Sequence, residues 1–419
     1  VYKRQRRLSS ALLDHSVPFR PDEIKLGGLS SASHRLDLGF RRIAKTRPRS
    51  SLQDGSRRVA LWLWGRLIPR AGGMKMGGMK GRILALVAAL MLIAAPAIAT
   101  GGVTFDGPVF GITRGPHGSV LVADASNGVQ AIADGSAPLI AELPGVSDVG
   151  YGRRATWAVT GLSEDGAPGS SSVYLINDSE TKLIADLWQW EVDNNPDPTE
   201  VDSNPYDIES MGRRALVVDA GGNDLLKVKA NGKVKLLAVF PQELASTQNL
   251  KDLVGCPEPT IPGFADFCEL PDQIPAESVP TSVAIGPDGD YYVGELKGFP
   301  APVGESNIWR VSKHARGAEC PSADCVKVFD GGFTSIVDLA FDKHGRLYVA
   351  EMDEASWAAV EFGLGAVGGT INKCNITTLN CWEIAEEIPM LTSITFTNRK
   401  LWATQNSLIP GAAEVFRVR

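Results

Sequence analysis

The sequence has 419 residues, of which 44% are hydrophobic and 21% charged, and this composition excludes a disordered or fibrous protein. Its formal net charge of -6 is the sum of two unlike parts, because the first 99 residues hold 19 Lys and Arg against 5 Asp and Glu, whereas residues 100–419 hold 23 against 43. A main body with a net charge of -20 repels phosphate backbones and anionic lipid surfaces, so we expect it to bind neither nucleic acid nor a membrane.

The chain begins with a segment, residues 1–73, that is rich in Arg and Ser and has no sustained apolar periodicity. Residues 74–99 then combine basic residues, a long apolar run and the small-residue sequence AIA, a pattern typical of a secretory signal peptide. A signal peptide belongs at the start of a chain. We therefore interpret residues 1–73 as non-native upstream translation that is disordered.

The apolar run has a second interpretation, an uncleaved membrane anchor. From Ile83 to Ala99 it is 17 residues long and contains Pro96, whereas a spanning helix needs roughly 20 residues. The length favours cleavage, before Thr100. We expect a secreted or periplasmic protein that has no membrane contact after cleavage and is a monomer.

All six cysteines follow the predicted cleavage site and form three close pairs in the sequence: Cys256 with Cys268, Cys320 with Cys325, and Cys374 with Cys381. An even number of cysteines in an exported chain favours disulfides. Local pairing is the simplest of the many connectivities that six cysteines allow. The sequence contains no CxxC spacing, which makes a metal site at these residues a weak alternative.

Residues 100–419 contain a repeated unit made of a short apolar strand, a tight turn and a second strand that ends in a polar residue. Most units are followed by two further strand candidates rich in Val, Ile and aromatic residues, which are β signals. The units are residues 111–124, 148–160, 207–219, 282–295, 338–351 and 393–405.

The sixth unit reaches the end of the chain without a fourth strand. Residues 103–112 align with residues 326–336, which contain the outer-strand candidate of an earlier unit, so the segment around Thr104 can supply the missing strand. Pairing the first strand with the last unit closes a ring and removes an open sheet edge. The sequence therefore predicts an all-β fold for residues 100–419, a six-bladed β-propeller closed by its N-terminal strand.

Four segments resemble the ScyD/ScyE family of exported propeller proteins, which is related to NHL-type repeats. They are SNPYDIES (203–210), DAGGNDLLKV (219–228), VPTSVAIGPDGDYYVGELKGFPAPVG (279–304) and FTSIVDLAF (333–341). The resemblance extends over most of residues 103–419 and implies a propeller fold and export. It implies no catalytic residue, so the activity remains open.

Propeller connections alternate between two faces, and here the turns between first and second strands are uniformly short. Nearly all insertions fall on the other, loop-rich face, and binding residues gather on elaborated loops. We therefore predict that ligand-binding residues lie on this loop-rich face. They are Asn204, Tyr206, Asp219, Glu295 and Phe299.

The residue that ends each second strand is expected to point to the channel mouth on the loop-rich face. The six are Asp124, Thr160, Asp219, Glu295, Glu351 and Gln405. A cation would relieve the repulsion between the four carboxylates, and Ca²⁺ prefers such oxygen ligands, with Asn127, Asn204 or Asn223 as further donors. Alternatively, these side chains cap neighbouring backbone N–H groups or are solvated around a water-filled channel. The acidic loop 191–204 is interpreted as a solvated loop.

Two functions fit this sequence. The first is an exported binding or scaffold protein that recognises a small molecule, a glycan or a protein. The second is a Ca²⁺-dependent hydrolase similar to the gluconolactonase-like propellers, in which a carboxylate activates water beside the metal. The sequence has no GxSxG, HExxH or P-loop motif, which favours a binding protein over an enzyme.

Overall fold

The computed structural model describes residues 102–161, 170–177, 180–197, 201–259 and 263–419. The predicted upstream segment 1–73 and signal peptide 74–99 lie outside the described residues. Within the described part, no helix is both long and apolar enough to cross a bilayer.

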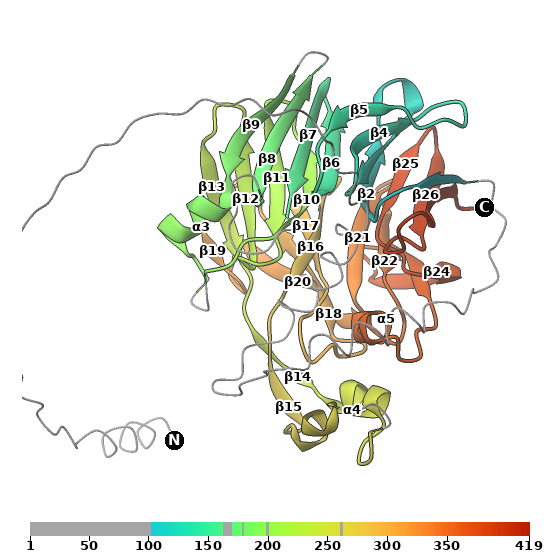
Figure 1. Cartoon of the computed structure of the whole chain (residues 1–419). Helices are drawn as coiled ribbons and strands as arrows, with labels where there is room; N and C mark the ends of the chain where they lie inside the picture. The colour runs from blue at the N-terminus through green and yellow to red at the C-terminus, as the bar shows by residue number, and fades with distance from the viewer. Residues whose placement is uncertain (1–101, 162–169, 178–179, 198–200, 260–262) are drawn as a thin grey trace, which may run out of the picture. The chain divides into compact units, whose positions relative to one another are not determined.

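Six sheets, here called blades 1 to 6, contain most strands of the described chain, and their consecutive strands pair antiparallel (Figure 1). Blade 1 contains β2 (Val109–Arg114), β3 (Val120–Asp124), β4 (Gly128–Ile132) and β5 (Leu139–Glu142). Blade 2 contains β6 (Val146–Gly152), β7 (Ala155–Thr160), β8 (Ser172–Asn177) and β9 (Glu180–Asp186). Blade 3 contains β10 (Pro205–Ser210), β11 (Arg214–Asp219), β12 (Asp224–Lys229) and β13 (Val234–Val239), to which β19 (Ala318–Glu319) adds in parallel.

The second half of the chain continues the pattern. Blade 4 contains β16 (Pro280–Ile285), β17 (Tyr291–Glu295), β18 (Ser306–Val311) and β20 (Cys325–Phe333). Blade 5 contains β21 (Ile336–Phe341), β22 (Leu347–Glu351), β23 (Gly369–Asn375) and β24 (Asn380–Ile388). Blade 6 contains β25 (Ile394–Thr397), β26 (Lys400–Gln405), β27 (Ala413–Arg417) and, from the start of the described chain, β1 (Val103–Phe105).

The first strands of the six blades contact one another in a closed ring, in the order β2, β6, β10, β16, β21, β25 and back to β2. The ring closes through β1, which pairs with β27 so that Thr104 lies opposite Glu414. This confirms the predicted six-bladed propeller and its closure. Phe105 on β1 is 4% exposed and packs in the core between blades 6 and 1, so the closing strand is held by apolar burial as well as by backbone pairing.

The loop-rich face carries helices and one hairpin that the strand pattern did not predict. The hairpin is β14 (Glu243–Ser246) with β15 (Gln273–Ala276), and between its strands lie α4 (Gln248–Val254) and the 3-10 helix η2 (Ala265–Glu269). The remaining helices are α3 (Leu187–Asn194) and α5 (Trp357–Phe362), while a 3-10 turn, η1 (Pro116–Gly118), lies on the opposite face. The ring of Phe264 lies 5.3 Å from that of Phe362, which fastens the hairpin extension to α5.

The three predicted disulfides are present, and no described cysteine is free. Cys256 and Cys268 join the end of α4 to η2 within the extension. The other two bonds each close a short connection before the outer strand of a blade, in blades 4 and 5. Such bonds stabilise mainly by restricting the unfolded chain.

Candidate functional site

The first five inner strands share one irregularity. In each, the pairing with the second strand skips one residue, so a bulged residue stands at the same depth in every blade. The bulged residues are Phe110, Ser147, Tyr206, Thr281 and Val337. All five are at most 8% exposed, and the rings of Phe110 and Tyr206, from blades 1 and 3, meet edge to face at 6.3 Å. This buried layer closes the central channel toward the loop-rich face.

A group of three carboxyl residues follows the bulges. Asp148, Asp207 and Asp338 lie at equivalent positions of blades 2, 3 and 5, and we call them the aspartate ring. Each carboxyl accepts a hydrogen bond from the inner strand of the next blade. The Oδ2 acceptors lie 3.0 Å from Ile208 N, 2.6 Å from Val283 N and 2.7 Å from Ile394 N, respectively. The ring therefore ties neighbouring blades together at the channel wall.

Smaller residues occupy the same position in the other three blades. Ser393 in blade 6 donates to Asp338 Oδ2 at 2.6 Å and accepts from Ile112 N of blade 1 at 3.0 Å. It thus continues the hydrogen bonds between neighbouring blades from blade 6 to blade 1. Gly111 in blade 1 has no space for a side chain, because a Cβ there would lie 1.7 Å from Asp148 Oδ1. Asp148 thus occupies the volume that a side chain of blade 1 would need.

Crowding of these acids changes their ionisation. Burial, and then the charge of Asp207 and a hydrogen bond to it, raise the pKa of Asp148 well above its usual value. Burial, and then the charge of Asp207, likewise raise the pKa of Asp338 well above its usual value. Burial also raises the pKa of Asp207, while its bond to Asp148 acts in the opposite direction. All three directions mean that the folded protein disfavours the charged forms of these acids.

Glu209 adds a fourth acid, two positions beyond Asp207 along β10. Burial, and then the charge of Asp207, raise its pKa to about 8, although the positive charge of Arg114 acts in the opposite direction. Its carboxyl has no hydrogen-bond partner among the described residues that would fix it to a strand. Glu209 is therefore the acid most available to a bound molecule.

These residues line a central cavity of about 900 Å³. Its floor is made by four residues of the bulge layer, Phe110, Tyr206, Thr281 and Val337, together with Thr392. Its wall carries the aspartate ring and Glu209. Its rim is made by the tight turns, where Lys343, His344 and Arg399 are exposed. The cavity is thus a blind pocket that opens on the tight-turn face, opposite to the face on which the sequence predicted binding residues.

The residues that end the second strands lie elsewhere, since none of the six lines the pocket. In each blade the second strand lies outside the inner strand, further from the axis of the propeller. The side chain at its end therefore contacts residues of its own blade and does not reach the pocket. Asp124 accepts from Ser126 N at 2.9 Å and from Gln130 Nε2 at 2.9 Å, and Asp219 accepts from the backbone of Gly221 and Gly222 at 3.1 Å. These two carboxylates cap loops of blades 1 and 3.

Glu295 and Glu351 are held in the same way in blades 4 and 5. Glu295 is fully buried, and it pairs with the buried ammonium of Lys297 at 3.0 Å and accepts from Trp309 Nε1 at 3.0 Å. Glu351 accepts from Thr334 N and from Asn372 Nδ2 at 2.5 Å, and burial raises its pKa to about 7. Each of the four carboxylates accepts at least one backbone N–H bond, which for Glu295 comes from Asn307 N at 3.1 Å.

Calcium binding by Asp124, Asp219, Glu295 and Glu351 was expected from their convergence, and it stays a prediction. Among the residues that the structure describes, no three His, Cys, Asp or Glu side chains gather so as to hold a metal ion. Of the predicted ligand-binding residues, Tyr206 lines the pocket floor, whereas Asn204, Asp219, Glu295 and Phe299 do not line the pocket. Binding at those four residues stays a prediction.

The aspartate ring was not predicted from the sequence, although the aligned repeats show a pattern at its position. When the repeats are aligned, one position of the first strand is occupied in turn by Gly111, Asp148, Asp207, Ser282, Asp338 and Ser393. Only the ring of inner strands shows that these positions meet around one axis.

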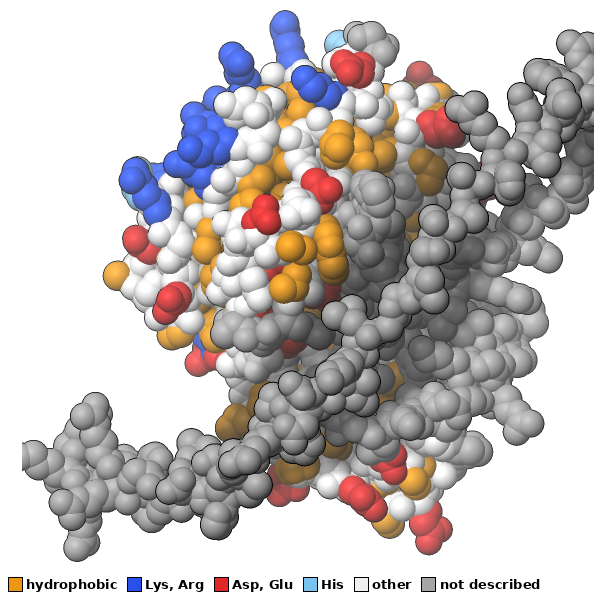
Figure 2. Space-filling model, turned by 60° about the vertical axis from the view of Figure 1, so that its left-hand side comes forward, with side chains coloured by type: hydrophobic (Ala, Val, Ile, Leu, Met, Phe, Trp, Pro, Cys, Tyr) orange, Lys and Arg blue, Asp and Glu red, His pale blue; other side chains and the backbone are white. Residues whose placement is uncertain are grey.

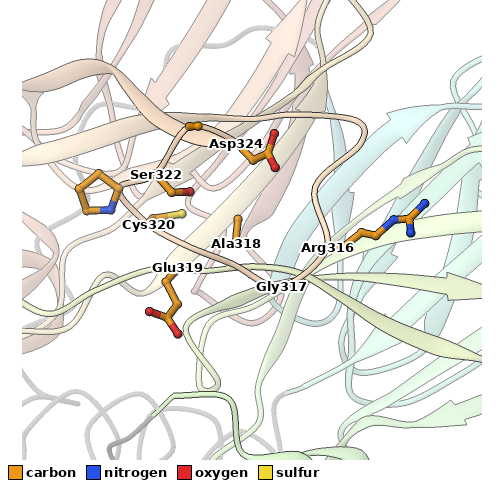
Figure 3. A pocket seen from close by; sticks show the side chains of 9 residues that line it. Arg316, Gly317, Ala318, Glu319, Cys320, Ser322 and Asp324 are labelled. Atoms are coloured by element: carbon orange, nitrogen blue, oxygen red, sulfur yellow. The ribbon is translucent and has the colours of Figure 1, made fainter.

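A second depression lies on the connection between β18 and β20 (Figure 3). It has a volume of about 620 Å³ and is lined by nine consecutive residues, Arg316 to Asp324, so it is the concave side of a single loop around Cys320. Polar side chains from different blades do not converge there. We therefore take the central pocket as the candidate site.

No family model and no curated protein matches this chain. Among solved structures, it is similar to virginiamycin B lyase from Staphylococcus aureus (14% identity, covering 75% of this chain and 85% of that chain, TM-score 0.41). It is also similar to an oxidoreductase (glucose dehydrogenase) from Thermus thermophilus (14% identity, covering 75% of this chain and 97% of that chain, TM-score 0.46). A further similar structure is an aldose sugar dehydrogenase from Streptomyces coelicolor (12% identity, covering 76% of this chain and 96% of that chain, TM-score 0.44). At these identities the likeness concerns the fold alone. The resemblance to the ScyD/ScyE family stays a prediction.

Proposed function

We propose that this protein is an exported binding protein that holds a small molecule in its central pocket, with a cationic group of that molecule against the acidic wall. A volume of about 900 Å³ is in the usual range for small-molecule sites, and the pocket is closed at one end. The three disulfides support folding in an oxidising compartment.

One observation carries the choice of ligand: four acids face one enclosed volume and repel each other. Asp207 raises the pKa of Asp148, Asp338 and Glu209, which means that negative charge accumulates unfavourably at this wall. An ammonium group or another organic cation would relieve that repulsion. An anionic ligand would increase it, so the wall selects against anions.

The rim complements this arrangement. Arg114, Lys343 and Arg399 are exposed at the mouth, so polar or anionic groups at the outer end of the ligand would face positive charge. The aspartates already bond to backbone N–H groups of the next blade, so the wall is rigid before a ligand enters. Such preorganisation favours binding because little ordering is required.

The test is calorimetric titration of the protein with putrescine, choline and lysine, with succinate and glucose as anionic and neutral comparisons. We expect a cationic probe to bind and to release protons, because a nearby cation lowers the raised carboxyl pKa values. Proton release appears as a binding enthalpy that changes with the ionisation enthalpy of the buffer. Binding of succinate or glucose as tightly as the best cation would refute the proposal.

Variants locate the site. We expect Glu209→Gln and Asp338→Asn each to weaken the binding of the cation at least tenfold, which corresponds to roughly 1.4 kcal/mol. Asp134→Asn, in an exposed turn, makes the same charge change outside the pocket and should leave the affinity unchanged. Equal losses in all three variants would show that the cation responds to overall charge, and the proposed site would be wrong.

A further inference from the structure

Blade 3 carries an unusual set of cations on one face of its outer strands. The pairing of β11 with β12 places Arg214 opposite Lys229, and the pairing of β12 with β13 places Lys227 opposite Lys235. Lys233 precedes β13, and its carbonyl accepts from Lys229 N at 3.0 Å. Because side chains alternate along a strand, these residues share one face. We call the five residues the basic stripe.

The stripe is internally repulsive. Like charges directly opposite each other on neighbouring strands destabilise a sheet. The charges of Lys229 and Lys233 are the largest causes that lower the pKa of Lys235, and Arg316, from the connection between β18 and β20, adds to them. The structure thus places a sixth cation beside the stripe from a different blade.

Within the part of the chain that the structure describes, the stripe lacks acidic partners. None of the ion pairs among the described residues includes a member of the stripe. Lys227 instead donates to the hydroxyl of Tyr291 at 2.9 Å. Arg214, Lys233 and Lys235 are exposed. Figure 2 shows Lys and Arg side chains gathered along the upper left edge of the molecule, with a few Asp and Glu side chains at the ends of this group.

The stripe stands out because the rest of the domain is acidic. Residues 100–419 hold 43 Asp and Glu against 23 Lys and Arg, so a random placement would put carboxylates beside most cations. A cluster that is unpaired and repulsive suits a negatively charged partner, which would remove the repulsion on binding. The shape of the cluster indicates what kind of partner.

We propose that the basic stripe binds a linear acidic polysaccharide. Neighbouring strands lie about 4.8 Å apart and alternate residues on a strand about 6.8 Å apart, so the cations of β11, β12 and β13 form a band as wide as one polymer chain. A flat anionic membrane would also face the acidic parts of the domain. A single chain avoids them, because exposed charges are screened beyond roughly 8 Å at physiological salt.

The experiment measures binding of the purified disulfide-bonded protein to immobilised polygalacturonate over a range of salt concentrations. We expect binding that weakens with salt. The variant Lys229→Gln/Lys233→Gln/Lys235→Gln should bind at least tenfold more weakly, with the slope of log affinity against log salt reduced by roughly 2. Its thermal stability should be equal or higher, because repulsion is removed.

A matched control variant is Lys400→Gln/Arg417→Gln/Arg419→Gln, which makes the same charge change at exposed positions of blade 6, across the ring from blade 3. It should retain wild-type binding. The same loss in this control, or no loss in the blade 3 variant, would overturn the proposal. Absence of binding to polygalacturonate, or tighter binding to single-stranded DNA or to phosphatidylglycerol vesicles, would also overturn it. Neutral dextran should not bind.

Discussion

The ionisation of Glu209 makes a quantitative test of the acidic pocket. In the folded protein, burial and the charge of Asp207 raise its pKa to about 8, whereas a glutamate in an unfolded chain has a pKa of about 4.3. Between these values, the native state holds a proton that the unfolded chain has released. The protonated carboxyl therefore contributes stability below the unfolded pKa, and this contribution is lost as the pH rises through about 8.

The two pKa values give the magnitude. Linkage with these values makes the free energy of unfolding about 3 kcal/mol larger at a pH of about 5.5 than at a pH of about 8. Glu209 is half-buried at the pocket wall, and water in the pocket screens part of its charge. We therefore expect a contribution of about 1 to 3 kcal/mol from this residue.

The assay is urea denaturation of the wild-type protein and of Glu209→Gln at both pH values. The wild type should be more stable at the lower pH, and the variant should lose about 1 to 3 kcal/mol of that difference. Glu142→Gln changes an exposed residue at the end of β5 and serves as the control. A variant that kept the full wild-type difference would refute the placement of Glu209 in an enclosed acidic pocket.

Three further predictions concern the ring and its interior. Gly111→Ala would place a Cβ 1.7 Å from Asp148 Oδ1, so we expect about 1 to 3 kcal/mol of lost stability in urea denaturation, and an unchanged midpoint would contradict the close approach. Phe105→Ala should cost about 3 to 5 kcal/mol and speed cleavage in limited proteolysis, because β1 closes the ring; proteolysis at the wild-type rate would count against that role. Lys297→Met leaves the carboxylate of Glu295 buried without its cation and should lower the free energy of unfolding by about 3 to 5 kcal/mol. Adding Glu295→Gln should restore part of that stability. No recovery in the double variant would show that the pair is not the cause.

The blades and the disulfides could be predicted because their signals are local. A strand of four to seven residues that alternates with a tight turn identifies itself by composition, and six copies can be counted directly. The cysteine pairs are separated by 12, 5 and 7 residues, so each bond joins positions that the chain already holds close together. The closure of the ring by the segment around Thr104 could be predicted from the alignment of residues 103–112 with residues 326–336, and from the tendency of proteins to avoid unpaired sheet edges.

The helices and the hairpin β14–β15 could not be predicted in the same way. They are short and lie in insertions without a repeat partner, and α3, α4 and α5 take their stability from packing on the blades. The lengths of the loops also did not predict on which face of the propeller the pocket opens. Long insertions predicted a site on the loop-rich face, but the bulge layer around Phe110 and Tyr206 closes the channel on that side.

The sequence by itself determined the number of blades, their strand order and the disulfide pairs, because each depends on contacts between neighbours along the chain. Tertiary structure alone decided which charges meet. Asp148, Asp207 and Asp338 lie 59 and 131 positions apart, yet the ring of inner strands brings them to one wall. Whether a side chain reaches the central pocket depends on how far its strand lies from the axis. That distance is set by the closed ring and by no segment of the chain alone.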